Sequence, residues 1–244
     1  MNLAIDIGNT RTKLGFFEGE TLVRKETLER LSADEVKSRL YNHSVSACIL
    51  SSVSETDPGI RELLAMETDF VELTSDTPLP IGNHYATPKT LGKDRLAAAV
   101  GAWSFFPGKT CLVIDAGTCI TSDVLSEDGI FKGGNISPGI DMRLKAMHTF
   151  TARLPLVGRG TTEHWIGTTT TEALQNGAQW GAIWELSALI DRCEAEFGPV
   201  EIALTGGDAE FFEKNMKRKI FAHPDLVLIG LNKILTYYGV SRSQ

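Results

Sequence analysis

The chain has 244 residues, of which 42% are hydrophobic, enough to bury one large core or two coupled cores. Its formal net charge of −7 argues against nucleic acid as the main partner, because binding a phosphate backbone needs a basic face. The sequence contains no signal peptide and no apolar run approaching ~18 residues, so we expect a cytoplasmic protein without membrane contact. Four scattered cysteines without a C-x-x-C pair favour reduced core residues.

The first informative element is a short apolar run, residues 3–5, that leads into Asp6-Ile-Gly-Asn-Thr10. A carboxylate at a strand end, a glycine that permits a tight turn and a following hydroxyl form a turn whose backbone N–H groups can face an anion. Residues 12–17, the turn at 18–20 and residues 21–24 follow, and their pattern predicts a hairpin.

The same pattern returns halfway along the chain. The apolar run 111–114 leads into Asp115-Ala-Gly-Thr118, followed by residues 120–125, a turn at 126–129 and residues 130–132. One short Asp-x-Gly turn would be weak evidence, whereas two in matched context indicate a duplicated phosphate-binding device. Two such turns facing each other could hold a nucleotide polyphosphate and its metal ion. We therefore predict two lobes, residues 1–106 and 107–244.

Helix signals occupy the intervening segments. Ser32 with Glu35 forms a capping box, and Asp57-Pro58 supplies an N-cap with a first-turn proline. Thr169 with Glu172 opens a long helix that extends to about Phe197. That helix carries Gly177 and Gly181 one turn apart, with two tryptophans nearby. It is either a core helix or part of a subunit interface.

The segment Gly92-Lys-Asp-Arg95 precedes a helical pattern at residues 96–100, which places Asp94 in the first turn. The helix dipole there favours an ionised carboxylate, as suits an aspartate that accepts a hydrogen bond from a substrate hydroxyl. An ordinary first-turn acidic residue is the alternative. Three competing motifs are absent: Gly108-Lys-Thr110 lacks the earlier glycine of a P-loop, and neither G-x-G-x-x-G after a strand nor G-x-S-x-G occurs.

Taken together, the motifs resemble the type III pantothenate kinases, relatives of the actin, sugar-kinase and Hsp70 superfamily. The resemblance runs from residue 2 to about residue 231. It rests on Asp6-x-Gly-Asn-Thr10-x-x-Lys13, Gly92-x-Asp-Arg95, Asp115-x-Gly-Thr118, Gly133-Gly-Asn-Ile-Ser-Pro-Gly139, Gly167-x-x-Thr170 and Thr205-Gly-Gly-Asp208. The one departure is Lys93, where a small residue such as alanine would be expected.

The resemblance implies an α/β fold of two tandem RNase H-like lobes with a nucleotide cleft between them. It implies phosphorylation of pantothenate at its 4′-hydroxyl by ATP, the first step of coenzyme A synthesis, in a homodimer. Mg²⁺ should travel with ATP. A monovalent cation, K⁺ or NH₄⁺, should bind at Asp115.

The resemblance also assigns roles to individual residues. Asp94 resembles the proton acceptor, and Arg95 could pair with the pantothenate carboxylate or instead form an ion pair within the chain. The nucleotide-binding set comprises Asp6, Ile7, Gly8, Asn9, Thr10, Arg11, Thr12, Lys13 and Thr118. The pantothenate-binding set comprises Tyr85, Gly92, Lys93, Asp94, Arg95 and Thr170.

Two alternatives remain. One is a related kinase that acts on another small alcohol, and the other is a non-catalytic, actin-like ATP-binding regulatory protein. The presence of Gly92-x-Asp-Arg95 beside both phosphate turns argues against the second. Acceptor-dependent release of ADP separates all three.

Overall fold

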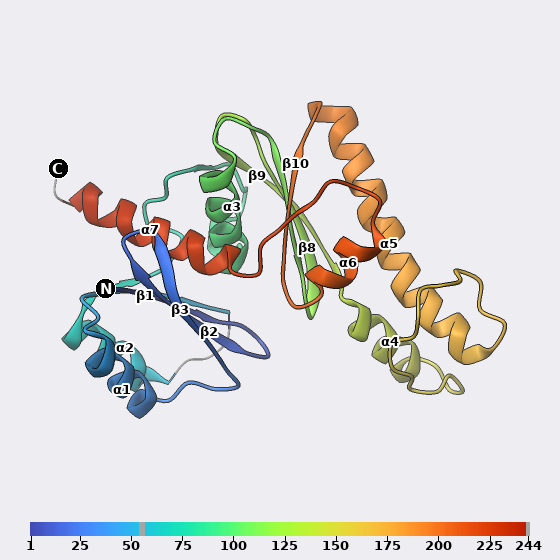
Figure 1. Ribbon diagram of the computed structural model, residues 1–244, viewed down its shortest axis with the longest axis horizontal. Helices are drawn as coiled ribbons and strands as arrows, with labels where there is room; N and C mark the ends of the chain where they lie inside the picture. The colour runs from blue at the N-terminus through green and yellow to red at the C-terminus, as the bar shows by residue number, and fades with distance from the viewer. Residues whose placement is uncertain (54–56, 243–244) are drawn as a thin grey trace. The chain divides into compact units, whose positions relative to one another are not determined.

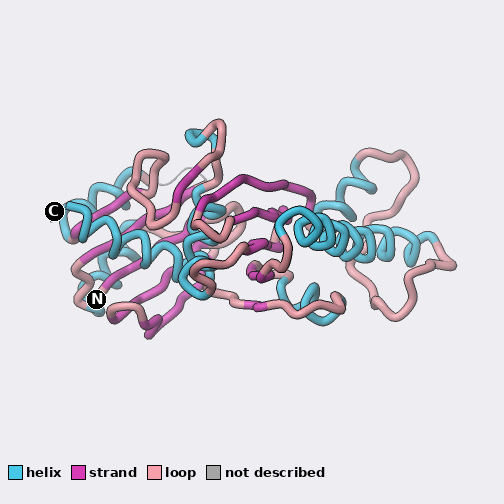
Figure 2. The backbone as a smooth tube through the Cα atoms, turned by 90° about the horizontal axis from the view of Figure 1, so that it is seen from above, coloured by secondary structure: helices cyan, strands magenta, loops and turns pink. Residues whose placement is uncertain are grey.

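The computed structural model describes residues 1–53 and 57–242, which fold as two compact units. Unit 1 contains residues 1–109, 125–133 and the segment from Asp225 onward, and unit 2 contains residues 110–124 and 134–224. Figure 1 colours the chain from the N-terminus to the C-terminus, and Figure 2 distinguishes its helices, strands and loops. The predicted lobes, residues 1–106 and 107–244, describe two copies of one fold and are not the same division as these compact units. Their boundary remains a prediction.

The sheet of unit 1 has the order β3-β2-β1-β4-β5. Strands β1, β2 and β3 form an antiparallel meander, and β4 and β5 continue the sheet parallel to β1. Their bounds are β1 Asn2–Ile7, β2 Thr12–Glu18, β3 Thr21–Leu28, β4 Ala47–Ser52 and β5 Asp69–Glu72. The hairpin predicted from residues 12–24 is confirmed, because β2 and β3 pair across the Glu18-Gly-Glu20 turn.

The second sheet repeats this order with β9, β8, β7, β10 and β11, and β6 is added at its β9 edge. The bounds are β6 Gly82–Asn83, β7 Cys111–Ala116, β8 Cys119–Leu125, β9 Ile130–Pro138, β10 Glu201–Thr205 and β11 Phe221–Ala222. Again the strand that carries the aspartate next to its last residue lies between a hairpin and a parallel strand that follows one or more helices. The duplication predicted from the two aspartate turns is therefore confirmed at the level of complete sheets.

The predicted helix starts are confirmed. Helix α1, Ala33–His43, has both bonds of the Ser32–Glu35 capping box, and α2, Pro58–Glu67, begins after Asp57, whose carboxylate accepts from the Gly59 N–H at 2.9 Å. Helices α1 and α2 enclose a core with the first sheet, built from residues such as Leu3, Phe16 and Leu64. Because hydrophobic burial supplies most of the driving force, this core fixes the ends of β1 and β2.

Helices α3, Lys93–Phe105, and α7, Leu226–Arg242, lie side by side in unit 1 (Figure 1). Their backbones meet at glycines: a Cβ on Gly230 would lie 1.8 Å from the Ala97 carbonyl oxygen, and one on Gly101 would lie 2.3 Å from that of Leu226. Only glycine allows this approach. The buried Asn232 then connects α7 to the first sheet, since it accepts a hydrogen bond from Asn2 and donates one to the Gly19 carbonyl.

Unit 2 is covered by α4, Ile140–Thr149, α5, Thr170–Phe197, and α6, Ala209–Asn215. Helix α5 begins at the predicted Thr169–Glu172 capping box and ends at Phe197, as expected. One face of α5 lies in the core through residues such as Ala178, Ala182 and Leu186. Within residues 1–53 and 57–242, none of the helices combines the length and the hydrophobicity that a membrane span requires.

The glycines of α5 lie away from that core. A Cβ at Gly177 would meet nothing within 4 Å, and one at Gly181 would meet only the tip of Arg143, at 4.0 Å. Beside them Trp184 is 51% exposed, and its ring meets that of Trp165 edge-on and lies tilted against that of Trp180. Close packing at these glycines is therefore not made within the described part of the chain.

Candidate functional site

The first of the two predicted phosphate turns is the connection between β1 and β2 in unit 1. Asp6 lies opposite Lys13 in the antiparallel pair, and the Gly8 N–H donates to the Arg11 carbonyl at 3.1 Å. Asn9, Thr10 and Arg11 are exposed at the tip. The turn therefore presents its tip to solvent between two strands whose positions the core determines.

Two members of the predicted nucleotide-binding set have buried side chains. Ile7 is 8% exposed and Thr12 is 2% exposed, so both side chains are packed inside the unit. Neighbouring residues of a strand point to opposite faces of the sheet, which explains why Ile7 and Thr12 are buried while Asp6 and Lys13 beside them are partly exposed.

A buried hydroxyl accompanies Asp6. Ser51 on β4 lies in register with Asp6 on the parallel strand, so the two side chains share a face of the sheet. The Ser51 side chain is fully buried, and its Oγ has no hydrogen-bond partner among the described residues. A buried hydroxyl without a partner costs about 1–3 kcal/mol, which points to a polar neighbour that arrives with a ligand or with water.

The second predicted phosphate turn joins β7 to β8 in unit 2. Asp115 lies near the end of β7, the Gly117 N–H donates to the Cys119 carbonyl at 2.9 Å, and Thr118 is exposed at the tip. The start of α4 packs against it: the Gly139 N–H donates to the Thr118 carbonyl at 3.1 Å. A Cβ on Gly139 would lie 2.1 Å from the Gly117 carbonyl oxygen, which explains a glycine there.

Strand β10 delivers a third segment to this turn. Thr205 lies in register with Asp115, and Gly206 has φ +97°, a conformation that side chains rarely adopt. A Cβ on Gly206 would lie 2.2 Å from the Ala116 carbonyl oxygen and 2.5 Å from Asp115 Oδ1. Glycine at 206 therefore brings the turn after β10 directly against the aspartate turn.

The surroundings of Asp115 contain oxygen ligands suited to a hard cation. Thr205 is 1% exposed, and its Oγ1 has no hydrogen-bond partner among the described residues. A carboxylate, a neighbouring hydroxyl and backbone carbonyls are the ligand types that such cations prefer. The chemistry of the residues present therefore fits the cation expected at Asp115. Thr205 also repeats Ser51, since each is the buried hydroxyl beside its lobe's aspartate.

Asp94, the predicted proton acceptor, lies at the start of α3 in unit 1. Gly92 is the N-cap, and Asp94 lies in the first turn as predicted. The Asp94 carboxylate accepts from the Arg95 N–H at 2.9 Å and folds back over Gly92, where a Cβ would lie 2.6 Å from Asp94 Oδ1. Lys93 is half-buried beside them. Gly92 is thus the residue that makes room for this position of the carboxylate.

Arg95 and Tyr85 lie together with Phe131, which was not among the predicted site residues. Arg95 is 5% exposed, and its guanidinium carbon lies 5.6 Å from the Tyr85 ring centre and 5.9 Å from that of Phe131. These distances are typical of a cation–π arrangement. A Cβ on Gly133 would contact the Tyr85 ring at 3.3 Å, so the ring is held from that side as well.

Thr170 opens α5 in unit 2. Its neighbour Thr169 is the N-cap and accepts from the Glu172 N–H, while the Thr168 N–H and hydroxyl both donate to the Glu172 carboxylate at 2.8 Å. These bonds hold the pKa of Glu172 below its ordinary value. Capping is therefore carried out by Thr169 and Glu172, and Thr170 is exposed beyond them.

Comparison with known proteins decides the family. The model of the type III pantothenate kinases matches residues 2–192. A type III pantothenate kinase from Bacteroides fragilis is 41% identical over 238 residues, which cover 97% of this chain and 98% of the relative. The chain belongs to the type III pantothenate kinase family. It is therefore a kinase by family, and the resemblance inferred from the motifs is confirmed.

Solved structures support the fold. A protein from Campylobacter jejuni described as a Baf-family transcriptional activator superposes with a TM-score of 0.63 at 22% identity, covering 98% of this chain and 99% of that one. A ROK hexokinase from Thermus thermophilus gives 0.50 at 15% identity, covering 98% and 99%. At these identities the likeness concerns the fold alone, and the predicted two-lobed class shared with sugar kinases is confirmed.

Proposed function

We propose that this member of the type III pantothenate kinase family transfers the γ-phosphoryl group of ATP to the 4′-hydroxyl of pantothenate, the first step of coenzyme A synthesis. The observation that carries the proposal is the identity of 41% to a kinase of that name across 97% of the chain. The duplicated aspartate turns support the ATP part of the proposal independently, because they arise from the residues and the strand order.

In this proposal the two aspartate turns hold the phosphates. Residues 6–13 supply backbone N–H groups and the Lys13 ammonium to the transferring phosphate, and Thr118 supplies a hydroxyl from the second turn. The exposed tips at Asn9 to Arg11 and at Thr118 support these roles. Positioning and charge stabilisation account for most of the catalysis of phosphoryl transfer, so a rigid strand-turn-strand frame suits the task.

Asp94 is proposed as the base that accepts the proton of the pantothenate hydroxyl. Because the transition state of phosphoryl transfer is commonly loose, the carboxylate mainly orients the hydroxyl and takes its proton late. The defined position of the carboxylate over Gly92 supports this role. Tyr85, Gly92, Lys93, Arg95 and Thr170 complete the proposed pantothenate-binding set.

Within that set, Arg95 is proposed to meet the pantothenate carboxylate. Its guanidinium lies over two aromatic rings, which restricts the plane of its fork, and a planar fork matches a carboxylate in two parallel hydrogen bonds. An intramolecular ion pair is the alternative for Arg95. Replacing Arg95 by lysine should raise KM for pantothenate more than KM for ATP if the substrate role is correct.

Two kinds of cation complete the proposal. Mg²⁺ travels with ATP, because Mg²⁺ is usually bound through one or two carboxylates together with substrate phosphates. A monovalent cation, K⁺ or NH₄⁺, binds at Asp115, where the buried Thr205 hydroxyl supplies a further oxygen. When bound, this cation offsets phosphate charge.

We further propose a cytoplasmic homodimer. The four cysteines are all free thiols, which suits a reducing compartment. The open glycines of α5 and the exposed Trp184 beside them support helix packing against a second copy. Thr170 opens the same helix, and we propose that it reaches pantothenate bound mainly by the other subunit.

The test is acceptor-dependent release of ADP by the purified chain with Mg²⁺ and K⁺ present. Release that requires pantothenate supports the proposal. Release without any acceptor would instead indicate an ATPase, and release only with another small alcohol would indicate a kinase of different specificity. Either of these results would overturn the assignment of pantothenate.

A further inference from the structure

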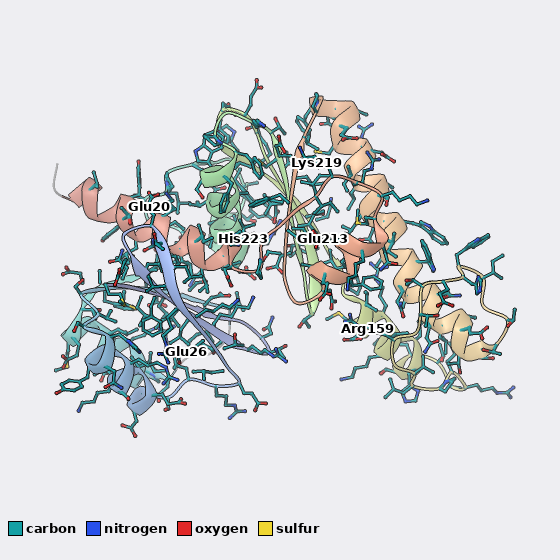
Figure 3. The ribbon with its side chains drawn as sticks, in the orientation of Figure 1. Glu20, Glu26, Arg159, Glu213, Lys219 and His223 are labelled. Atoms are coloured by element: carbon teal, nitrogen blue, oxygen red, sulfur yellow. The ribbon has the colours of Figure 1, made fainter. Side chains whose placement is uncertain are left out.

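Arg159, labelled in Figure 3, lies in the connection between α4 and α5. It binds two carboxylates from other segments of unit 2. Its Nε and Nη2 donate to the two oxygens of Asp141 at 2.7 and 2.8 Å. Its Nη1 and Nη2 donate to the two oxygens of Asp208 at 2.7 and 3.0 Å. The guanidinium therefore forms a double fork, which only an arginine can make.

Both carboxylates belong to segments that pack against the second phosphate turn. Asp141 lies in the first turn of α4, two residues after Gly139, whose N–H donates to the Thr118 carbonyl at 3.1 Å. Asp208 ends the turn after β10, and its own N–H donates to the Ala116 carbonyl at 2.8 Å. The start of α4 and the turn after β10 therefore each form a backbone hydrogen bond to residues 115–118. Arg159 links the same two segments to each other through their carboxylates.

The connection that carries Arg159 is itself fixed to α5. The Gln179 side chain accepts from the Gly160 N–H at 2.7 Å and donates to the Gly160 carbonyl at 3.1 Å. The Gln175 side chain donates to the Gly158 carbonyl at 2.9 Å. These bonds lie directly on either side of Arg159. The guanidinium is therefore held from a rigid helix and can define the position of what it binds.

The two ion pairs of Arg159 differ in how far solvent screens them. The Asp141 side chain is 72% exposed, so this pair is largely screened by solvent, whereas the Asp208 side chain is 11% exposed. Loss of the arginine would leave Asp208 nearly buried without its charged partner, and such a carboxylate moves or recruits water. The turn at Gly206 and Gly207 would move with it.

We propose that Arg159 is a positioning residue for the nucleotide half of the site: it holds the Gly206-Gly207-Asp208 turn in place against the Asp115–Thr118 turn. The inference rests on the proposed function for its ligand, a nucleoside triphosphate. In this role Arg159 affects the binding of the nucleotide. It does not contact pantothenate and takes no part in the chemical step.

The experiment compares Arg159→Gln with Arg218→Gln as a matched control. Arg218 also binds two carboxylates, Asp191 and Glu194, but these lie on α5 away from the phosphate turn. Binding of a non-hydrolysable ATP analogue is measured by calorimetry without pantothenate, and KM is measured for both substrates. We expect Arg159→Gln to weaken analogue binding and raise KM for ATP by about 10- to 100-fold, because each hydrogen bond that the displaced turn fails to make to the nucleotide changes binding by up to about 10-fold.

Further variants separate position from charge. Arg159→Lys keeps the charge but not the double fork, and should show an intermediate defect. The double variant of Arg159→Gln and Asp208→Asn lacks the surplus negative charge, but the hydrogen bonds between residues 159 and 208 are still missing. The defect in nucleotide binding should therefore persist. Full recovery in the double variant would mean that Arg159 acts through charge alone, and the positioning role would be wrong.

Several outcomes would overturn the inference. They are analogue binding by Arg159→Gln equal to that of Arg218→Gln, or equal increases of KM for ATP and for pantothenate. If Arg159→Gln does not fold, as judged by circular dichroism, the same comparison is made with Arg159→Lys. Failure of the proposed function is distinguished by the wild-type chain, which would then lack pantothenate-dependent ADP release whatever the variants do.

Discussion

Gly92→Ala should remove most of the activity while leaving the fold intact. The new Cβ would lie 2.6 Å from Asp94 Oδ1, whereas real Cβ contacts essentially never fall below 3.0 Å, so the carboxylate must move by at least about 0.4 Å. The atom in the way is the end of a flexible side chain, and the rotation that clears it also disturbs the bond from the Arg95 N–H. We expect the carboxylate to leave its position over the N-cap.

The two consequences differ in size. A positioned base contributes about 10²–10⁴-fold, so its partial displacement should lower kcat about 10- to 100-fold, or about 1.4–2.7 kcal/mol of barrier. Stability should change by less than about 1 kcal/mol. Gly92 has φ −58° and ψ 126°, which alanine adopts freely, and the lower entropy of the unfolded chain offsets the poorer N-cap.

The assay is steady-state kinetics beside urea denaturation. The matched control is Gly239→Ala, since a Cβ there meets nothing within 4 Å and the position lies in α7. The double variant of Gly92→Ala and Asp94→Asn should be no slower than Asp94→Asn alone, because both changes act through one carboxylate. Normal kcat in Gly92→Ala, or additive losses in the double variant, would refute this account of Gly92.

Four further predictions follow from the same site. Asp94→Asn should retain pantothenate binding and lose about 10²–10⁴-fold in kcat, and a variant that keeps more than about a tenth of normal kcat would exclude Asp94 as the base. Activity should require K⁺ or an ion of similar size, and Asp115→Ala should lose both that dependence and most of the rate; equal rates in sodium-only and potassium buffers would count against the cation site. Co-refolding Asp94→Asn subunits with Thr170→Phe subunits should restore activity through heterodimers with one intact pocket, and inactive but proven heterodimers would show that the site is not shared. The hydrogen bond from Arg159 lowers the pKa of Asp141 in the folded state, so the stability advantage of wild type over Asp141→Asn should be present above about pH 4, the ordinary value, and should disappear as the pH falls through the lowered value; urea denaturation at neutral and at acidic pH measures this gap, and a gap of equal size at both would contradict the linkage.

Local signals in the sequence predicted the helix starts and the two aspartate turns. Capping at Ser32, Asp57 and Thr169 involves residues only two or three positions apart, so the chemistry is visible without a structure. The repeated hairpins predicted the duplication for the same reason. The complete strand order depends on which strands pair after intervening helices, and only the fold reveals it.

Features that depend on distant partners were not predictable in this way. Gly101 and Gly230 are required because α3 and α7 meet, and these helices are separated by more than a hundred residues. Ser51 reads as an ordinary strand residue until its register with Asp6 is known. Arg159 lies in a connection without periodic pattern, and its two carboxylates come from segments that lie before and after it in the chain.

The central claim is that this chain phosphorylates pantothenate with Asp94 as the base. The most direct measurement is mass-spectrometric detection of 4′-phosphopantothenate after incubation with ATP, Mg²⁺, K⁺ and pantothenate, in parallel for wild type and Asp94→Asn. The account predicts product in amounts equal to the ADP released by wild type, and a reduction of about 10²–10⁴-fold in the variant. ADP without phosphorylated pantothenate in the wild-type reaction would contradict the claim.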